Sequence, residues 1–187
     1  MRSPLEAVRG PVRRRTTLAF GLIALLVSAF VAAVCFTVTR STLVHQREDA
    51  AERQAFVNAR AVRTVLRLAA ADPVEALGRA RISGDGAGLV QVEGNWSTSA
   101  VGASRDDIPP ALLAAADRGV AARQRIEWGG GTTVAVATPI ADVGAVYVEL
   151  VPMADVARTL TQLQRALVVA VVVATGLGSA AGWAASG

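Results

Sequence analysis

The sequence has no lysine, one histidine, one cysteine and few aromatic residues, and each shortage narrows the possible functions. A single cysteine cannot form a disulfide within the chain and cannot build a thiol metal site. Cys35 lies inside the first apolar run, where a small packing residue is the simplest interpretation. Any domain outside a membrane must therefore be held together by packing alone.

Net positive charge is also missing from most of the chain. All 19 basic residues are arginines, and five of them lie in residues 2–15, ahead of the first apolar run. The remaining 14 arginines are balanced by 14 acidic residues, and all of these charges lie between residues 40 and 165. The net charge of +4 therefore belongs to a short N-terminal tail, which argues against a basic surface for nucleic acid.

Two long stretches contain no charged residue at all. They are residues 16–39 and residues 166–187, of 24 and 22 residues, and a helix needs about 20 apolar residues to span the hydrocarbon core of a bilayer. The first stretch is longer than the apolar core of a secretory signal, so we expect an uncleaved anchor. The five tail arginines favour a cytoplasmic N-terminus. The sequence thus predicts a multi-pass plasma-membrane protein.

These features divide the chain into four expected parts. They are a cytoplasmic basic tail (1–15), a first transmembrane helix (16–39), an extracytoplasmic sensor domain (40–165) and a second transmembrane helix (166–187). Within the sensor domain we expect a stalk helix over 41–71, a mixed α+β region over 89–151 and a second stalk helix over 153–165.

The first stalk helix is predicted from one apolar stripe. Residues three and four positions apart lie on the same face of a helix, and this spacing is followed by Ala55, Ala59, Val62, Leu66 and Ala69. Arginines gather on another face, at positions 53, 60, 63 and 67. The dipeptide Asp72-Pro73 is expected to end this helix, because proline disfavours a helical conformation in the residue before it.

The mixed region is expected to form an antiparallel sheet. A strand is predicted over 89–93, and a short helix is opened by Pro109-Pro110 and closed by Gly119. Two strands, 125–128 and 132–138, flank the glycine turn 129–131, and a last strand over 145–151 follows the turn 142–144. The order predicts an α+β fold with helices on one side of the sheet, like that of extracytoplasmic PAS-like sensor modules.

The second stalk carries a heptad seam that runs into the second membrane helix. The seam consists of Met153, Val156, Leu160, Leu163 and Leu167. It either packs against the 41–71 helix within one chain or joins two chains into a four-helix stalk, and we expect the homodimer. Small residues recur every four positions in both membrane helices, which permits close packing in lipid. They are Ala24, Ser28 and Ala32 in the first and Ala174, Gly178, Gly182 and Ser186 in the second.

Several passages resemble the N-terminal half of an actinobacterial transmembrane sensor histidine kinase of a two-component system. They are Gln46-Arg47-Glu48, residues 54–60 (QAFVNAR), residues 107–110 (DIPP), residues 144–149 (GAVYVE) and residues 155–160 (DVARTL). The resemblance extends over nearly the whole chain. It implies a signal-input module whose HAMP linker, phosphoaccepting histidine domain and ATP-binding domain would follow the second membrane helix.

Those kinase parts are missing from the sequence, so we expect a truncated chain. In this interpretation ATP, Mg²⁺ and a response regulator belong only to the missing module, which performs the ATP-dependent autophosphorylation of the family. Two alternatives stay open: the input half of another two-helix receptor, such as a chemoreceptor or cyclase, and a non-enzymatic membrane anchor or binding protein.

No catalytic or metal-binding constellation is expected within the chain. His45 lacks the following glutamate of a phosphoaccepting histidine and has no second ligand nearby for a metal. The glycine passages 84–88 and 129–131 lack the lysine of a phosphate loop, so they are interpreted as turns. Asp106 and Asp107 are interpreted as helix caps rather than as a carboxylate pair for acid–base chemistry.

The ligand-binding residues cannot be assigned from the sequence. The aromatic residues of the domain are Phe56, Trp96, Trp128 and Tyr147. The two tryptophans on predicted strands either line a small pocket or, as we expect, fill the core. Arg123 and Arg125 either meet an anionic ligand or, as we expect, lie on a solvated strand edge.

Overall fold

A computed structural model describes residues 6–68 and 72–185. In chain order its helices and strands are α1 (Glu6–Leu66), α2 (Pro73–Gly78), β1 (Ala87–Val92), β2 (Asn95–Thr98), α3 (Pro110–Asp117), β3 (Ala122–Trp128), β4 (Gly131–Ile140), β5 (Ala145–Pro152) and α4 (Ala154–Ala185). The chain separates into two units, one made of Met1–Leu43 with Arg158–Gly187 and the other of Val44–Ala157. The expected α+β class is confirmed, with a long helix before the sheet and another after it.

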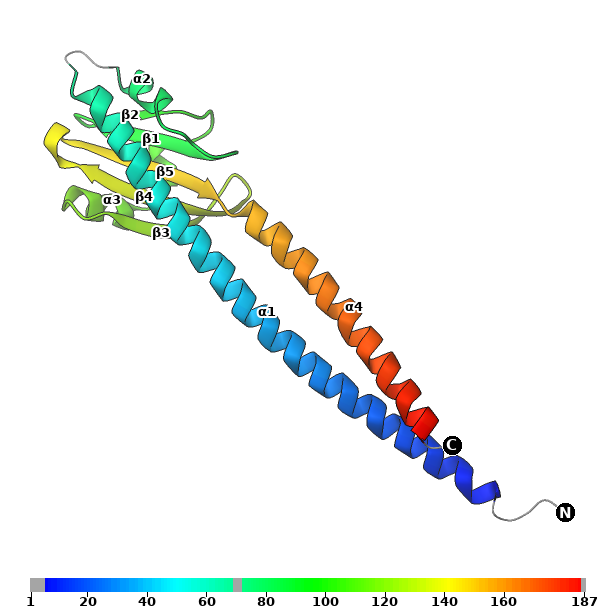
Figure 1. Cartoon of the computed structure of the whole chain (residues 1–187). Coiled ribbons are helices and arrows are strands. Elements are labelled where there is room, and N and C mark those ends of the chain that lie inside the picture. Colours follow the sequence, from blue (N-terminus) through cyan, green and yellow to red (C-terminus); the bar gives the residue numbers. More distant parts are fainter. Residues whose placement is uncertain (1–5, 69–71, 186–187) are drawn as a thin grey trace. The chain divides into compact units, whose positions relative to one another are not determined.

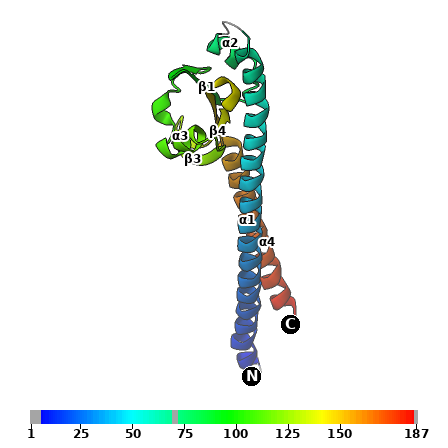
Figure 2. The same cartoon turned by 90° about the vertical axis from the view of Figure 1, so that its left-hand side faces the viewer.

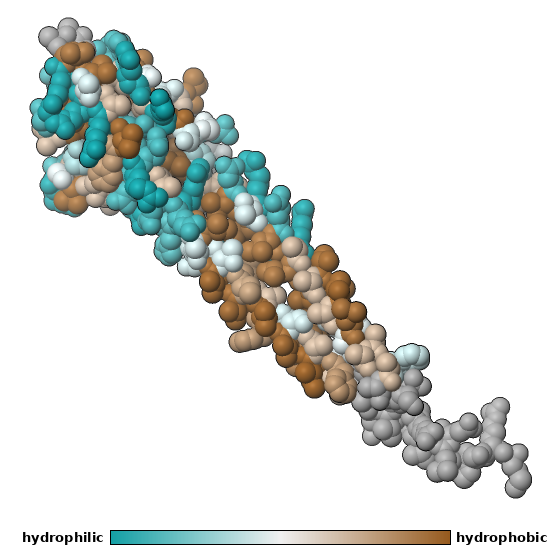
Figure 3. Space-filling model, in the orientation of Figure 1, coloured by the Kyte–Doolittle hydropathy of each residue, from teal (hydrophilic) through white to brown (hydrophobic). Residues whose placement is uncertain are grey.

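The first unit consists of helical segments whose apolar side chains face outward. Two helices are long and apolar enough to cross a membrane, within Leu18–Leu66 and Ala154–Ala181, and their most apolar windows are wholly exposed. Figure 3 shows this hydrophobic surface in brown along both helices. Helices satisfy their own backbone hydrogen bonds, so an apolar helix of this length suits a bilayer. Two candidate membrane spans are therefore present where the sequence predicts them.

Small residues bring α1 and α4 close together within this unit. A methyl group added to Gly178 would come within 2.6 Å of Ala24 Cβ, and one added to Gly21 would come within 2.7 Å of Ser179 Oγ. Both separations are below the usual carbon contact of about 3.5 Å, so glycine permits this approach. Ala24 and Gly178 both belong to the predicted rows of small residues, and the last two members of the second row lie outside the side chains that the structure describes.

Four members of the heptad seam lie along one face of α4, whereas Met153 precedes the helix and is buried in the core of the second unit. Leu160, Leu163 and Leu167 are half-buried, whereas the residues between them are exposed. Leu167 lines an apolar groove of about 310 Å³ together with Ala32 and Phe36 of α1. At this position the seam therefore has neighbours within its own chain, and a dimer formed through it stays a prediction.

The second unit is built on a five-stranded antiparallel sheet in the order β2-β1-β5-β4-β3 (Figure 1). β5 lies at the centre of this sheet, between β1 and β4. The predicted glycine hairpin joins β3 to β4, with Gly129 and Gly130 at φ 62° and 78° between the paired residues Trp128 and Gly131. A two-residue turn with positive φ at both positions suits the twist of paired strands.

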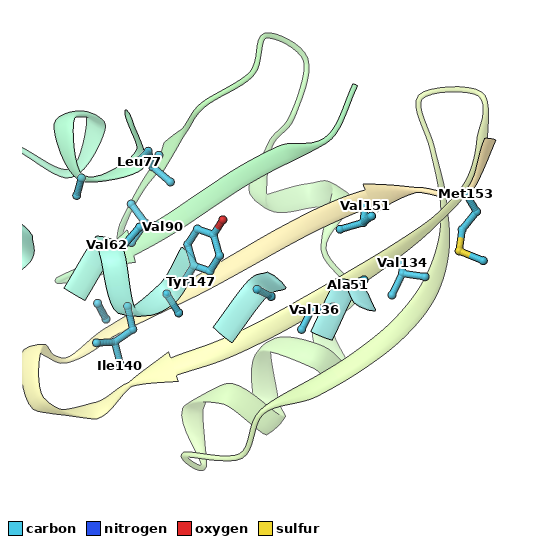
Figure 4. Close-up of a cluster of buried hydrophobic side chains, with 14 residues drawn as sticks. Ala51, Val62, Leu77, Val90, Val134, Val136, Ile140, Tyr147, Val151 and Met153 are labelled. Atoms are coloured by element: carbon cyan, nitrogen blue, oxygen red, sulfur yellow. The ribbon is translucent and has the colours of Figure 1, made fainter. Parts of the chain in front are cut away.

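Both faces of the sheet are apolar, and helices cover both. Side chains alternate along a strand, so Val136 and Tyr147 pack with residues of α1 and α2, whereas Ala137 and Val148 pack with residues of α3. Figure 4 shows the first of these clusters, and Figure 2 shows α1 and α3 on opposite sides of β4. The expectation of helices on one side only is wrong, because β4 and β5 are apolar on both faces and each face needs a cover.

The apolar stripe of α1 is largely confirmed. Ala55, Ala59 and Val62 are 0%, 4% and 0% exposed, and Leu66 is partly buried against the same cluster. The last member of the stripe, Ala69, lies outside the described residues. The predicted short helix is also present: α3 begins at Pro110 and is followed by Gly119 in a left-handed conformation, at φ 79°.

One strand is absent from the sequence-based prediction. β2 pairs with β1 through a tight turn in which Glu93 and Gly94 have φ of 50° and 85°. Its four residues, Asn95–Thr98, are mostly polar and have no more than partial burial. A short edge strand gains its stability from pairing rather than from an apolar pattern, so hydrophobic periodicity does not detect it.

The dipeptide Asp72-Pro73 begins a helix instead of ending one. α1 already ends at Leu66, and the Asp72 side chain accepts a hydrogen bond from Val74 N at 2.9 Å as the N-cap of α2. Aspartate at the N-cap and proline in the first turn are both typical of helix starts. In the sequence, the same two residues are compatible with the end of one helix and with the start of the next. In the structure they form the start of α2.

Candidate functional site

A carboxyl group lies inside the second unit, on the face of the sheet that α1 covers. Glu149 is in the middle of β5, and its side chain is fully buried. Because side chains alternate along a strand, Glu149 points to the same face as Tyr147 and Val151, which belong to the cluster beneath α1. Burying a carboxyl group is costly unless its oxygens are hydrogen-bonded, so its surroundings form the candidate site.

Asn58 of α1 provides the main partner of this carboxyl group. Asn58 is 2% exposed, and its Nδ2 donates to Glu149 Oε2 at 2.9 Å. The Tyr147 hydroxyl donates to the same oxygen at 3.1 Å. One oxygen of Glu149 therefore has two donors, one from the helix and one from its own strand.

The same asparagine fixes the loop that precedes β1. The Arg81 backbone N–H donates to Asn58 Oδ1 at 2.9 Å, and Asn58 Nδ2 donates to the Arg81 carbonyl oxygen at 3.2 Å. Gln54, one helical turn earlier, donates to the same carbonyl oxygen at 3.1 Å. Asn58 thus joins three segments of the unit: α1, the loop before β1, and β5.

Glu149 also lines a small cavity, and its second oxygen has no hydrogen-bond partner among the described residues. Glu149 Oε1 and Arg47 Nε are buried atoms with no hydrogen-bond partner among the described residues. Both residues line one cavity of about 120 Å³. The full lining is Arg47, Ala50, Ala51, Gln54, Ser83, Glu149 and Val151. One acidic and one basic side chain, each with a buried atom that lacks a partner, therefore line the same cavity.

Burial controls the ionisation of this site. Desolvation raises the pKa of Glu149 above its ordinary value, although the hydrogen bonds from Asn58 and Tyr147 favour the ionised form and oppose the shift. Burial also raises the pKa of Tyr147, and the neighbouring Glu149 adds to that shift. The Tyr147 hydroxyl thus keeps its proton and acts as a donor, while Glu149 can respond to a charge placed in the cavity.

Glu149→Gln is expected to remove a pH dependence of stability. The folded protein holds the Glu149 proton more tightly than the unfolded chain does, so the free energy of unfolding falls as the pH rises from about 4.5 through the raised pKa. Glutamine keeps an acceptor oxygen for Asn58 and Tyr147 but cannot ionise. The variant should therefore match the wild type in acid and be more stable at neutral pH.

Thermal unfolding of the full chain in detergent micelles, followed by circular dichroism at several pH values, measures this difference. Glu75→Gln, which alters an exposed glutamate of α2, is the matched control and should follow the wild type at every pH. A Glu149→Gln variant that is less stable than the wild type at neutral pH would contradict the interpretation.

Arg123 and Arg125, the candidate anion contacts, bind carboxylates of α1. Arg123 Nη1 lies 2.8 Å from Asp49 Oδ1 and 2.9 Å from Glu52 Oε2, and Arg125 pairs with Glu48. The hydrogen bond from Arg123 holds the pKa of Asp49 below its ordinary value. Both arginines are exposed on the edge strand β3, as expected, and there they form ion pairs with α1.

Trp96 and Trp128 are partly buried and pack against the cluster on the α3 side of the sheet. Trp128 also borders a surface hollow of about 520 Å³, whose lining does not include Trp96. The two rings do not share this hollow, and their packing agrees with a core-filling role. Phe56 is 39% exposed on α1, while Tyr147 belongs to the buried site.

His45 and Cys35 both lie on α1, away from the cavity lining. His45 Nδ1 is 3.8 Å from Glu48 Oε2, and its side chain is 66% exposed. Cys35 is exposed in the apolar part of the helix. Among the described residues, no group of three histidine, cysteine, aspartate or glutamate side chains is arranged to hold a metal ion.

The acidic pair before α3 has a local role. Asp107 Oδ2 accepts hydrogen bonds from Ser104 N at 2.7 Å and from Ser104 Oγ at 3.0 Å. Asp106 is 93% exposed and lies 3.7 Å from Arg105. Asp107 thus caps the 3-10 turn at Arg105–Asp107 rather than α3, whose N-cap residue is Pro109.

Sequence reasoning missed the cavity residues, although one signal was present. Glu149 is the only charged residue between positions 143 and 154, in a stretch predicted to be a strand. A charge inside an apolar strand must be buried and paired if both faces of the sheet are covered. Two of the passages that carry the kinase resemblance, 54–60 and 144–149, supply Asn58, Tyr147 and Glu149.

Comparison with known proteins gives no relative from which a role could be transferred. No protein-family model, no curated protein and no solved structure matches the chain.

Proposed function

We propose that the chain is the signal-input module of a membrane-bound sensor histidine kinase. One observation carries this proposal: a folded α+β domain lies in the chain between two long apolar helices. The resemblance of several passages to that family adds to it. In this proposal the kinase module is attached after α4 and uses ATP and Mg²⁺, and a response regulator is reached only through it.

The proposed location follows from charge and hydropathy. Residues 40–165 form an extracytoplasmic PAS-like domain, the two apolar helices cross the plasma membrane, and the arginine-rich tail lies in the cytoplasm. The positive-inside tendency of flanking arginines supports this orientation. The central antiparallel sheet and its flanking helices support a PAS-like arrangement.

Chain continuity provides a route for the signal. α1 runs unbroken from Glu6 to Leu66, and only Met153 separates β5 from α4. Inside the domain, the Asn58–Glu149 hydrogen bond joins α1 to β5, the strand that leads into α4. A stimulus that changes this contact would bias the packing of α1 against β5, and small shifts of packed elements are a known form of switching.

Sequencing the locus through and beyond the codon for Gly187 tests the proposal. We expect the frame to continue into arginines, a linker, and a histidine directly followed by glutamate. A chemoreceptor or cyclase domain after the codon, or a stop codon there in a well-covered locus, would contradict the kinase assignment.

We also propose that the module is a homodimer joined through its stalk. A two-position heptad seam suits a symmetric helix pair, and cysteines that face each other across such a seam can form a disulfide. In a Cys35→Ala background, Leu160→Cys and Leu163→Cys are each expected to give mostly disulfide-linked dimers after mild oxidation of native membranes. Non-reducing electrophoresis measures the dimer fraction.

Gln162→Cys provides the matched control, because this exposed residue lies between the two seam positions and should stay largely monomeric. Monomers at both seam positions, or equal cross-linking at position 162, would show that the stalk does not pair through this seam.

A further inference from the structure

We infer that the cavity between α1 and β5 binds a small zwitterion, an α-amino acid of the size of glycine or alanine. The ammonium group of the ligand would meet Glu149 Oε1, and its carboxylate would meet Arg47. The inference rests on the proposed input role, because it names the stimulus that such a module would detect.

Two buried atoms without partners, one from an acidic and one from a basic side chain, carry the inference. Glu149 Oε1 and Arg47 Nε are buried and make no hydrogen bond within the described part of the chain. A buried polar group left without a partner keeps the full cost of its desolvation, so both groups favour a ligand that supplies the missing hydrogen bond. A zwitterion supplies a donor to the first group and an acceptor to the second.

Some arginines on or near α1 have carboxylate partners, whereas Arg53 and Arg60 of the same helix form no ion pair within the described part of the chain. Arg123 binds Asp49 and Glu52, while Arg63 binds Asp142 with its Nε 2.9 Å from Oδ2. The ion pairs among the described residues do not include Arg47. Arg47 is half-buried and lines the cavity, and its Nε is buried without a hydrogen-bond partner within the described part of the chain.

The size and lining of the cavity limit the ligand. A volume of about 120 Å³ exceeds the roughly 10–15 Å³ that one water molecule needs, but it leaves little room for a long side chain. Ala50, Ala51 and Val151 provide apolar walls that a hydrogen or methyl side chain could contact. Gln54 and Ser83 add polar groups to the lining.

Such a ligand would connect α1 and β5, the two segments that join the domain to the candidate membrane spans. Arg47 lies on α1, and Glu149 lies on β5 four residues before Met153, where the chain enters α4. A molecule held by both charges would fix α1 against β5. Binding at this place could therefore change the packing equilibrium that the proposed function requires.

Glycine binding to the full chain in lipid nanodiscs tests the inference, by thermal unfolding and by isothermal titration calorimetry. A ligand that binds only the folded state raises Tm in a saturable way. We expect glycine to do so, and acetate and methylammonium, which each carry half of its charges, to give little shift at the same concentration. Glu149→Gln and Arg47→Gln should each weaken glycine binding about 10-fold or more, as expected for removal of one partner of a buried charge pair.

Arg60→Gln, on an exposed arginine of the same helix outside the cavity lining, should bind glycine like the wild type. Absence of a saturable glycine effect, an equal effect of acetate alone, or unchanged binding by the folded Glu149→Gln variant would overturn the inference. These measurements need no kinase, so a failure here leaves the reading-frame test of the proposed function unaffected.

Discussion

Replacing Asn58 with alanine is expected to lower the free energy of unfolding by about 3 kcal/mol, because one buried group and one partly buried group lose a partner, and a buried group left unpaired costs about 1–3 kcal/mol. Glu149 Oε2 loses the donor at 2.9 Å, and the Arg81 N–H loses its acceptor. The volume of the amide is also left empty in a close-packed interior. Urea unfolding of the full chain in detergent, followed by circular dichroism, measures the loss.

Asn95→Ala is the matched control, since Asn95 is the only other asparagine of the chain and is exposed on β2. Its effect should stay within about 0.5 kcal/mol. Asn58→Asp adds a sharper test: an ionised aspartate beside Glu149 repels it, so this variant should lose more stability at neutral pH than in acid. A loss below about 1 kcal/mol for Asn58→Ala would show that Asn58 does not hold the cluster together.

The sequence predicts most of the fold of the second unit because its main elements carry strong local signals. Three of these signals are the apolar stripe of α1, the glycine turn at Gly129-Gly130 and the Pro110 helix start, and all three are present in the structure. β2 carries no such signal, since a four-residue polar strand is defined by its pairing with β1. Local pattern therefore predicts elements that bury their own apolar face, and it misses those that depend on a neighbour.

The candidate site is harder to predict for a different reason. Asn58 and Glu149 are 91 positions apart, and no periodicity indicates which turn of α1 crosses which residue of β5. The polar character of Glu149 in an apolar strand shows that a partner must exist, but it does not identify that partner. Arg47 is still harder to predict, because it is distinguished by having no ion pair among the described residues, and a sequence does not show which arginines are paired.

Packing between α1 and the sheet depends on small side chains. Ala51, Ala55 and Ala59 are 3%, 0% and 4% exposed on the face of α1 that meets the sheet. Alanines at this spacing let a helix lie close to its neighbour, and interiors of normal density contain few voids that could accept a larger group. The close approach also sets the distance from the α1 residue Asn58 to Glu149.

Replacing Ala55 with leucine is therefore expected to lower the free energy of unfolding by about 2–3 kcal/mol, the cost of overpacking a filled core. The added side chain should push α1 away from β5 and weaken the Asn58–Glu149 hydrogen bond, so the pH dependence attributed to Glu149 should change along with the stability. Urea unfolding at acid and neutral pH measures both effects. Val57→Leu, on a residue of the same helix that is 59% exposed, should shift stability by less than about 0.5 kcal/mol. An Ala55→Leu variant as stable as the wild type would mean that α1 has room to move over the sheet, and the position of Asn58 would then depend on its hydrogen bonds rather than on helix packing.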